Sequence, residues 1–93
     1  MSPEELYKPL LTERGKVHGD WSFNASVQRC LKDQIRVGLK QRSEAGLWPL
    51  TIPQLEALDM ICVKISRIIA GDPSHADHWD DIAGYAQLGK GKQ

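Results

Sequence analysis

The sequence is short of cysteines and of long apolar runs, and it has no excess of either charge. Its 93 residues include two cysteines, Cys30 and Cys62, too few for a disulfide framework; we expect reduced core thiols of a cytoplasmic protein. No apolar run reaches the roughly 18 residues that a membrane-spanning helix needs, so no membrane partner is expected. Twelve basic and twelve acidic residues cancel, which removes any bulk attraction to nucleic acid.

Several motifs of known chemistry are also missing. The chain has neither a Walker A loop nor a Gly-x-Gly-x-x-Gly fingerprint, the two common phosphate-binding loops. No Ser-His-Asp or Cys-His arrangement stands out for nucleophilic catalysis. His75 and His78 are spaced for one helical face, but no cysteine or third histidine lies at a suitable spacing. This pattern argues against a zinc site.

What remains is the composition of an ordinary globular protein, with 41% apolar and 26% charged residues. The length fits a single domain covering residues 1–93. We predict an all-α fold, a compact bundle of three to four helices. The predicted segments are a helix at 1–14, a loop at 15–24, helices at 25–44, 53–70 and 74–88, and a flexible tail at 89–93.

The last two predicted helices form an antiparallel hairpin around which the chain is organised. Gly71 suits the position just after a helix, where a positive φ is usual. Asp72-Pro73 then starts the next helix, and Ser74 with Asp77 resembles a capping box. Pro53 opens the first helix of the pair.

Each helix of the hairpin has an apolar face and a mixed face, as a rotation of 100° per residue shows. The predicted core positions are Leu58, Ile61, Cys62, Ile65, Ile68, Ile69, Trp79, Ile82, Ala83 and Ala86. The mixed faces carry Glu56, Asp59, Met60, Val63, Lys64, Arg67, Asp77, Asp81, Gly84, Tyr85 and Leu88. Carboxylates among Met, Val, Leu and Tyr indicate a second contact, which is a ligand, a metal or a partner subunit.

The remaining segments support this hairpin. Asn24 is the predicted N-cap of the helix at 25–44, whose apolar positions Val27, Cys30, Leu31, Ile35 and Leu39 recur at helical spacing. In the loop that follows, Trp48, Leu50 and Ile52 are expected to plug one end of the bundle.

The loop at 15–24 allows two interpretations. It gathers His18, Asp20 and Trp21, with Arg14 just before it, and could close over a phosphate or a base. Alternatively, it is an ordinary connector whose Trp21 and Phe23 anchor it to the core, and composition alone favours this second interpretation.

The carboxylates of the hairpin are candidate metal ligands. Glu56 with Asp59, and Asp77 with Asp81, are pairs one turn apart, and Mg²⁺ prefers such oxygen ligands together with substrate phosphates. Lys64 and Arg67 would suit the phosphate oxygens. Acidic pairs on helices are more often surface residues, and a capping role also accounts for Asp77.

Three stretches, at 13–20, 56–68 and 77–86, resemble a family of small phage and prophage proteins of unassigned function. Their most specific feature is Lys-Ile-Ser-Arg-Ile followed by Asp-x-x-x-Asp-Ile-Ala-Gly-Tyr. That family is similar to the MazG-like all-α NTP pyrophosphatases. The resemblance implies that Glu56 and Asp59 match the first Mg²⁺-binding pair, and that Asp77 with Asp80 or Asp81 matches the second.

The chain departs from a typical pyrophosphatase in two ways. Its acidic residues are fewer and shorter, and the chain is minimal, so a complete pocket is expected to need a dimer or a higher oligomer. Three functions remain open. The first is a Mg²⁺-dependent pyrophosphohydrolase. The second is a sponge that sequesters a cyclic nucleotide or an ADP-ribose-type immune signal through Arg14, His18, Trp21 and Tyr85. The third is a structural oligomeric module.

Overall fold

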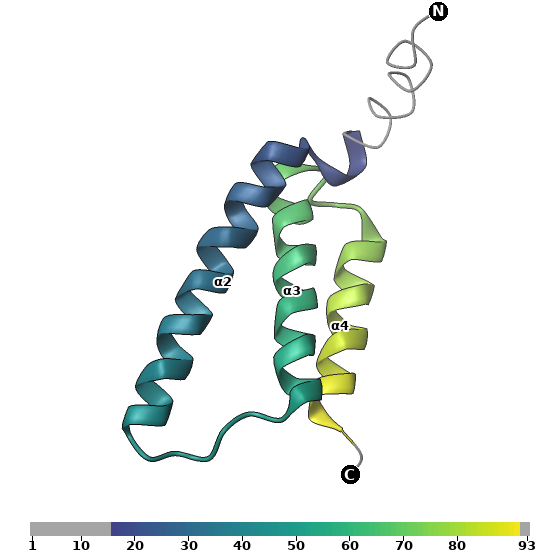
Figure 1. Cartoon of the computed structure of the whole chain (residues 1–93). Helices are drawn as coiled ribbons and strands as arrows, with labels where there is room; N and C mark the ends of the chain where they lie inside the picture. The colour runs from purple at the N-terminus through teal and green to yellow at the C-terminus, as the bar shows by residue number, and fades with distance from the viewer. Residues whose placement is uncertain (1–15, 92–93) are drawn as a thin grey trace, which may run out of the picture.

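The structure, a computed structural model, describes residues 16–91. This part contains three helices and no strand: α2 at Trp21–Glu44, α3 at Ile52–Ala70 and α4 at Ala76–Lys90 (Figure 1). The all-α prediction is therefore confirmed. The predicted helix at 1–14 and the last two residues of the predicted tail lie outside the described residues. No helix within residues 16–91 is long and apolar enough to span a membrane.

Helix α2 begins earlier than the sequence pattern indicated. Its N-cap is Asp20, whose carboxylate accepts a hydrogen bond from the Phe23 amide at 3.0 Å. The prediction of Asn24 as N-cap is wrong, because the first turn already includes that residue. Residues 16–18 are also helical, so the predicted loop at 15–24 shrinks to a short break before Trp21.

Helix α3 is capped at both ends. Thr51 and Gln54 form a capping box, in which each side chain accepts from the other residue's amide, at 3.2 Å and 2.9 Å. The helix ends at Gly71, whose φ is −117°. The predicted positive φ is therefore wrong, and the need for glycine there has another cause, described below.

Helix α4 begins at Ala76, later than predicted. His75 is its N-cap and makes no side-chain capping bond, so the predicted capping box of Ser74 and Asp77 is wrong. The turn is instead closed by Asp72, whose carboxylate accepts from the Ser74 amide at 2.9 Å. Such an Asx turn satisfies the backbone before the helix begins.

The three helices lie side by side, with α3 in the middle. Figure 1 shows α2 on one side of α3 and α4 on the other, with α4 beside α3 along its length and α2 diverging from α3 toward its C-terminal end. The α3–α4 pair is the predicted antiparallel hairpin. A domain usually consists of two packed layers of secondary structure. The described residues supply one such layer.

This layer has two different faces, which follow from the contacts of α3 and a rotation of 100° per residue. One face, here called the apolar face, contains Phe23, Val27, Leu31, Leu58, Ile61, Ile65, Ile69, Trp79, Ile82 and Ala86. The other, the charged face, contains Lys32, Arg36, Glu56, Asp59, Arg67, Asp77 and Asp81. The sequence predicted the two faces of the hairpin, and α2 extends both of them.

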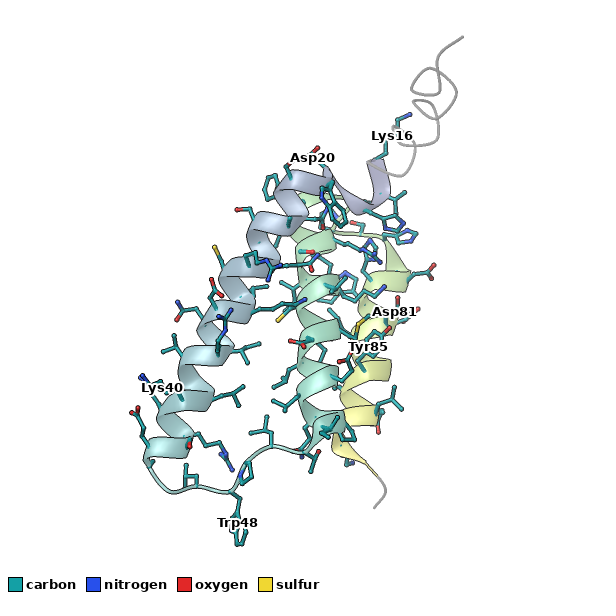
Figure 2. All side chains as sticks on the ribbon, in the orientation of Figure 1. Lys16, Asp20, Lys40, Trp48, Asp81 and Tyr85 are labelled. Atoms are coloured by element: carbon teal, nitrogen blue, oxygen red, sulfur yellow. The ribbon has the colours of Figure 1, made fainter. Side chains whose placement is uncertain are left out.

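Burial within the layer is slight. Ala57 and Cys62 are the two buried apolar residues among those described. Trp48 is 86% exposed and Ile52 81% exposed, so the prediction that they plug the end of the bundle is wrong. Figure 2 shows Trp48 pointing away from the helices. A layer with one uncovered face offers these side chains nothing to pack against.

Other predicted core positions are exposed for the same reason. The exposed residues among them are Cys30, Ile69, Trp79, Ala83 and Ala86. Trp21 and Phe23 do not anchor the preceding segment either, since both are exposed. Of the two thiols, Cys62 is buried and Cys30 is not.

The backbone before α2 touches the backbone after α3 at two glycines. A Cβ atom on Gly71 would lie 2.3 Å from the Val17 carbonyl oxygen, and one on Gly19 would lie 2.6 Å from the Ala70 carbonyl. Gly19 also has a φ of +87°, which favours glycine. The Val17 carbonyl accepts from the Asp72 amide at 3.0 Å. The close approach thus fixes residues 17–19 against the end of α3.

This joint makes a prediction for glycine substitutions. Gly19→Ala should lower the free energy of unfolding by about 1–3 kcal/mol, because the new Cβ meets both steric and backbone strain. Gly38→Ala, in the open middle of α2, is the control and should stabilise the chain slightly, by about 0.5–1 kcal/mol. Urea unfolding measures both. Equal effects of the two substitutions would contradict the described joint.

Candidate functional site

A buried hydrogen-bond network holds the end of the layer where residues 16–20, α2 and α3 meet. The Asn24 amide group donates to the carbonyl oxygens of His18, at 2.6 Å, and Asp20, at 2.9 Å. Its own oxygen lies 2.9 Å from the hydroxyl of Ser66, a residue with no exposed surface. Gln28 donates to the same hydroxyl at 3.2 Å. Buried polar groups that find partners in this way specify one arrangement of the backbone.

On the opposite side of α3 from this network, a lysine is buried between α3 and α4. The Lys64 ammonium lies 2.9 Å from an Asp81 carboxylate oxygen. The Lys64 side chain is 11% exposed, whereas that of Asp81 is 45% exposed. Asp81 thus separates a largely buried positive charge from solvent. Figure 2 shows Asp81 and Tyr85 one turn apart on α4, at its boundary with α3.

The three histidines of the chain meet beside this ion pair. The ring centroids of His75 and His78 are 4.7 Å apart, and that of His18 lies 5.2 Å from His78 and 6.1 Å from His75. His78 is 1% exposed, and its Nε2 lies 3.3 Å from the Val17 carbonyl oxygen. A carbonyl oxygen only accepts hydrogen bonds, so the ring nitrogen Nε2 acts as the donor in this contact.

The electrostatics of the site centre on Asp81. The hydrogen bond from Lys64 lowers the pKa of the Asp81 carboxyl below its ordinary value, and the charges of Lys64, His78 and Arg67 act in the same direction. Lys64 contacts this carboxylate directly, and His78 and Arg67 act on it through their charge. A lysine ammonium has three N–H donors, so anionic oxygens other than that of Asp81 can bind there as well.

The shifted pKa makes a prediction for acid unfolding. A lowered folded pKa means that Asp81 contributes to stability above its unfolded value of 3.8 and loses that contribution as the pH falls through the folded pKa. Thermal melts of Asp81→Asn should therefore show a weaker loss of stability on acidification below about pH 4 than wild type. Asp80→Asn, next to it and exposed, is the control and should keep the wild-type acid dependence.

The candidate metal ligands lie at different heights on the hairpin. Lys64 faces Asp81 across the two helices. Glu56 and Asp59 come eight and five residues before Lys64, which places them about 12 Å and 7.5 Å further along the axis. Asp77 lies one turn beyond Asp81 in the opposite direction. Mg²⁺ holds its oxygen ligands at about 2.1 Å, so one ion does not reach both pairs in a single chain.

The rest of the described chain gives the same result. Within residues 16–91, no three or more His, Cys, Asp and Glu side chains are placed to hold a metal ion. The three neighbouring histidines, His18, His75 and His78, are therefore not placed to hold a metal ion either. The residues of one chain therefore do not fit a four-carboxylate Mg²⁺ site.

The candidate phosphate-binding residues are only partly brought together. Lys64 and Arg67 both act on Asp81, and Tyr85 follows it on α4. His18 joins the other two histidines. The remaining candidates do not join this group: Asp20 caps α2, Trp21 is 82% exposed, and Arg14 lies outside the described residues.

Sequence reasoning missed two parts of this site. Asn24 was identified as a cap, yet its side chain bonds Ser66, 42 residues away. His18 lies far along the chain from His75 and His78, so spacing alone does not relate them. A signal was present in the histidine count, because all three histidines of the chain belong to this one cluster.

The geometry of this hairpin and its polar cluster can now be set beside known proteins. A family model, DUF6378, described as a domain of unknown function, matches residues 8–92. The chain belongs to the DUF6378 family. No curated protein and no solved structure matches it. No function of a relative therefore carries over to this DUF6378 chain.

Proposed function

We propose that this DUF6378 protein binds a nucleotide or a nucleotide-derived ligand through its phosphate groups, at the place where Lys64, Arg67 and Asp81 meet. The observation that carries the proposal is the largely buried Lys64 ammonium, 2.9 Å from a more exposed carboxylate. Burying a charge is costly unless it is paired. A lysine retained there beside a second cation, Arg67, is better explained by an anionic ligand than by stability.

The ligand would share the site with Asp81. Phosphate oxygens approaching from the charged face meet Asp81 first, because its side chain is the exposed member of the pair. Either they displace the carboxylate from Lys64 or they occupy the remaining ammonium donors. The planar Arg67 guanidinium offers paired donors to a second phosphate oxygen. Tyr85 is half-buried on α4, one turn after Asp81, and is a candidate surface on which the base stacks.

Of the functions that the sequence left open, binding without turnover is the one we favour. This preference rests on the separation of the two carboxylate pairs, which do not share one metal ion within a single chain. The resemblance to MazG-like pyrophosphatases keeps Mg²⁺-dependent hydrolysis as the alternative, in an oligomer. A protein that holds a nucleotide intact would act as a sponge in the cytoplasm of a phage-infected cell.

A panel of ligands separates these functions. Thermal shift is measured with NTPs, dNTPs, cyclic dinucleotides and cyclic ADP-ribose isomers, each in Mg²⁺ and in EDTA, and the mixtures are then analysed by HPLC. The proposal expects a stabilising shift that persists in EDTA, with the ligand recovered unchanged. Monophosphate and pyrophosphate formed only in Mg²⁺ would establish the hydrolase. No shift with any ligand contradicts nucleotide binding altogether.

A further inference from the structure

The apolar face is the largest feature of the molecule that ligand binding does not use. Its central stripe, on α3, consists of Leu58, Ile61, Ile65 and Ile69 at spacings of three or four residues. Three of these side chains are half-buried and Ile69 is 56% exposed. A hollow of about 510 Å³ opens at one end of this stripe, beside Leu58 and Ile61, and Leu50 and Ala86 line it as well. The face therefore lacks the second layer that helices normally pack against.

The covering partner can be argued from size. The 19 residues of α3 make the face about 28 Å long. Where the three helices pack together, axes about 8–10 Å apart make it roughly 20 Å wide. This gives a flat area of about 560 Å², the same order as the roughly 800 Å² that each partner contributes to a stable protein–protein interface. A small molecule would fill the hollow and leave the rest exposed, whereas another three-helix layer matches the whole face.

Charge supports a second copy as this layer. The α3 residues on the face are uncharged, and rotation of α2 by 100° per residue places its Asp and Glu side chains away from it. Twelve acidic and twelve basic residues leave no net repulsion between two copies. Arg42 lines the hollow at one end of the face, whereas the stripe on α3 carries no charge. An identical stripe therefore meets it at no electrostatic cost, and the stripe itself has no charged group that would select an acidic or basic partner.

We infer that two copies of this chain pack their apolar faces together, as an isologous two-layer dimer. The charged faces then point outward on both sides, and each copy keeps its own pair of Lys64 and Asp81 outside the interface. Dimer formation supplies the core that one chain lacks. Dimer formation does not depend on any ligand, so its test is independent of the test of nucleotide binding.

Two exposed residues give a matched test. Ile69 is 56% exposed on the apolar face, and Val37 is 52% exposed on the outer edge of α2. In a single chain, glutamate is tolerated about equally at either position. In the dimer, Ile69→Glu buries a charge at the interface, whereas Val37→Glu stays in solvent. The two substitutions therefore differ only if the apolar face is covered by a second copy.

Light scattering coupled to size exclusion measures the mass of the full chain and both variants at micromolar concentration. We expect wild type and Val37→Glu to be dimers, with twice the chain mass of 10.4 kDa. Ile69→Glu should be a monomer of 10.4 kDa that retains its helical circular dichroism. If Ile69→Glu unfolds, the melting temperature of wild type is measured at several protein concentrations instead. For a dimer it should rise with concentration, and a constant melting temperature would overturn the inference. A monomeric wild type, a dimeric Ile69→Glu or a dissociated Val37→Glu overturns the inference.

Discussion

Replacing Asn24 by alanine should cause the largest loss of stability of any single change in α2. The substitution removes two donated hydrogen bonds, to the carbonyls of His18 and Asp20, and one acceptor for Ser66. The Ser66 hydroxyl keeps the Val63 carbonyl, 2.6 Å away, as an acceptor, whereas the carbonyls of His18 and Asp20 each lose the donor that the buried Asn24 side chain supplies. We expect a decrease of about 3 kcal/mol in the free energy of unfolding. The melting temperature should fall by roughly 12–24 °C.

Gln28→Ala is the matched control for this prediction. Gln28 bonds the same Ser66 hydroxyl, but at 3.2 Å and from a half-buried position that water reaches. Its loss should cost less than about 1 kcal/mol. Urea unfolding followed by circular dichroism gives both values. If the two substitutions cost the same, Asn24 does not hold residues 18–20 to the layer in the way described.

The second large effect concerns Lys64. Lys64→Met keeps the length and the apolar stem of the side chain but removes the charge that the ligand's phosphates would contact. Hydrogen bonds to charged groups contribute about 1.5–3 kcal/mol, so affinity for tripolyphosphate should fall roughly 10- to 100-fold. Isothermal titration in EDTA measures this change without any contribution from a base, a sugar or a metal ion.

Lys40→Met is the control for that experiment. Lys40 has the same chemistry, but its side chain is 80% exposed and lies near the opposite end of α2 from Asp20 (Figure 2). Its replacement should leave the affinity for tripolyphosphate within about twofold of wild type, apart from weak screening effects. Equal losses for Lys40→Met and Lys64→Met would mean that the anion is bound by general charge and not at the proposed site.

Periodicity predicted most of the fold. The spacing of Leu58, Ile61 and Ile65 identified α3 and its apolar face, and the Gly71-Asp72-Pro73 turn marked the hairpin. These features are local, because they depend on residues three or four positions apart. What periodicity did not reveal is whether an apolar face is covered. That depends on the number of layers, which is why Trp48 was assigned to the core and is exposed.

The site was less predictable than the fold. Lys64, Arg67 and Asp81 were identified as candidates from helix faces, and the structure pairs two of them, Lys64 and Asp81, across the hairpin. Asn24 was misassigned because a polar residue near a helix start is usually a cap, whereas here a distant serine completes its bonds. The four carboxylates were grouped by spacing within each helix. Spacing does not give the relative height of two antiparallel helices, and it is this height that separates the pairs.

The phosphate site between α3 and α4 is tested most directly by titrating the ¹⁵N-labelled protein with tripolyphosphate in EDTA. The amide chemical shifts are recorded at each step of the titration. The account predicts saturable shifts concentrated at residues 64–67 and 78–85, with the amides of Leu58 and Val37 unchanged. If the shifts at residues 64–67 and 78–85 disappear in Lys64→Met, the phosphate is bound at the buried ammonium. Shifts spread evenly over the basic residues of α2, or no shifts at all, would contradict a phosphate site between α3 and α4.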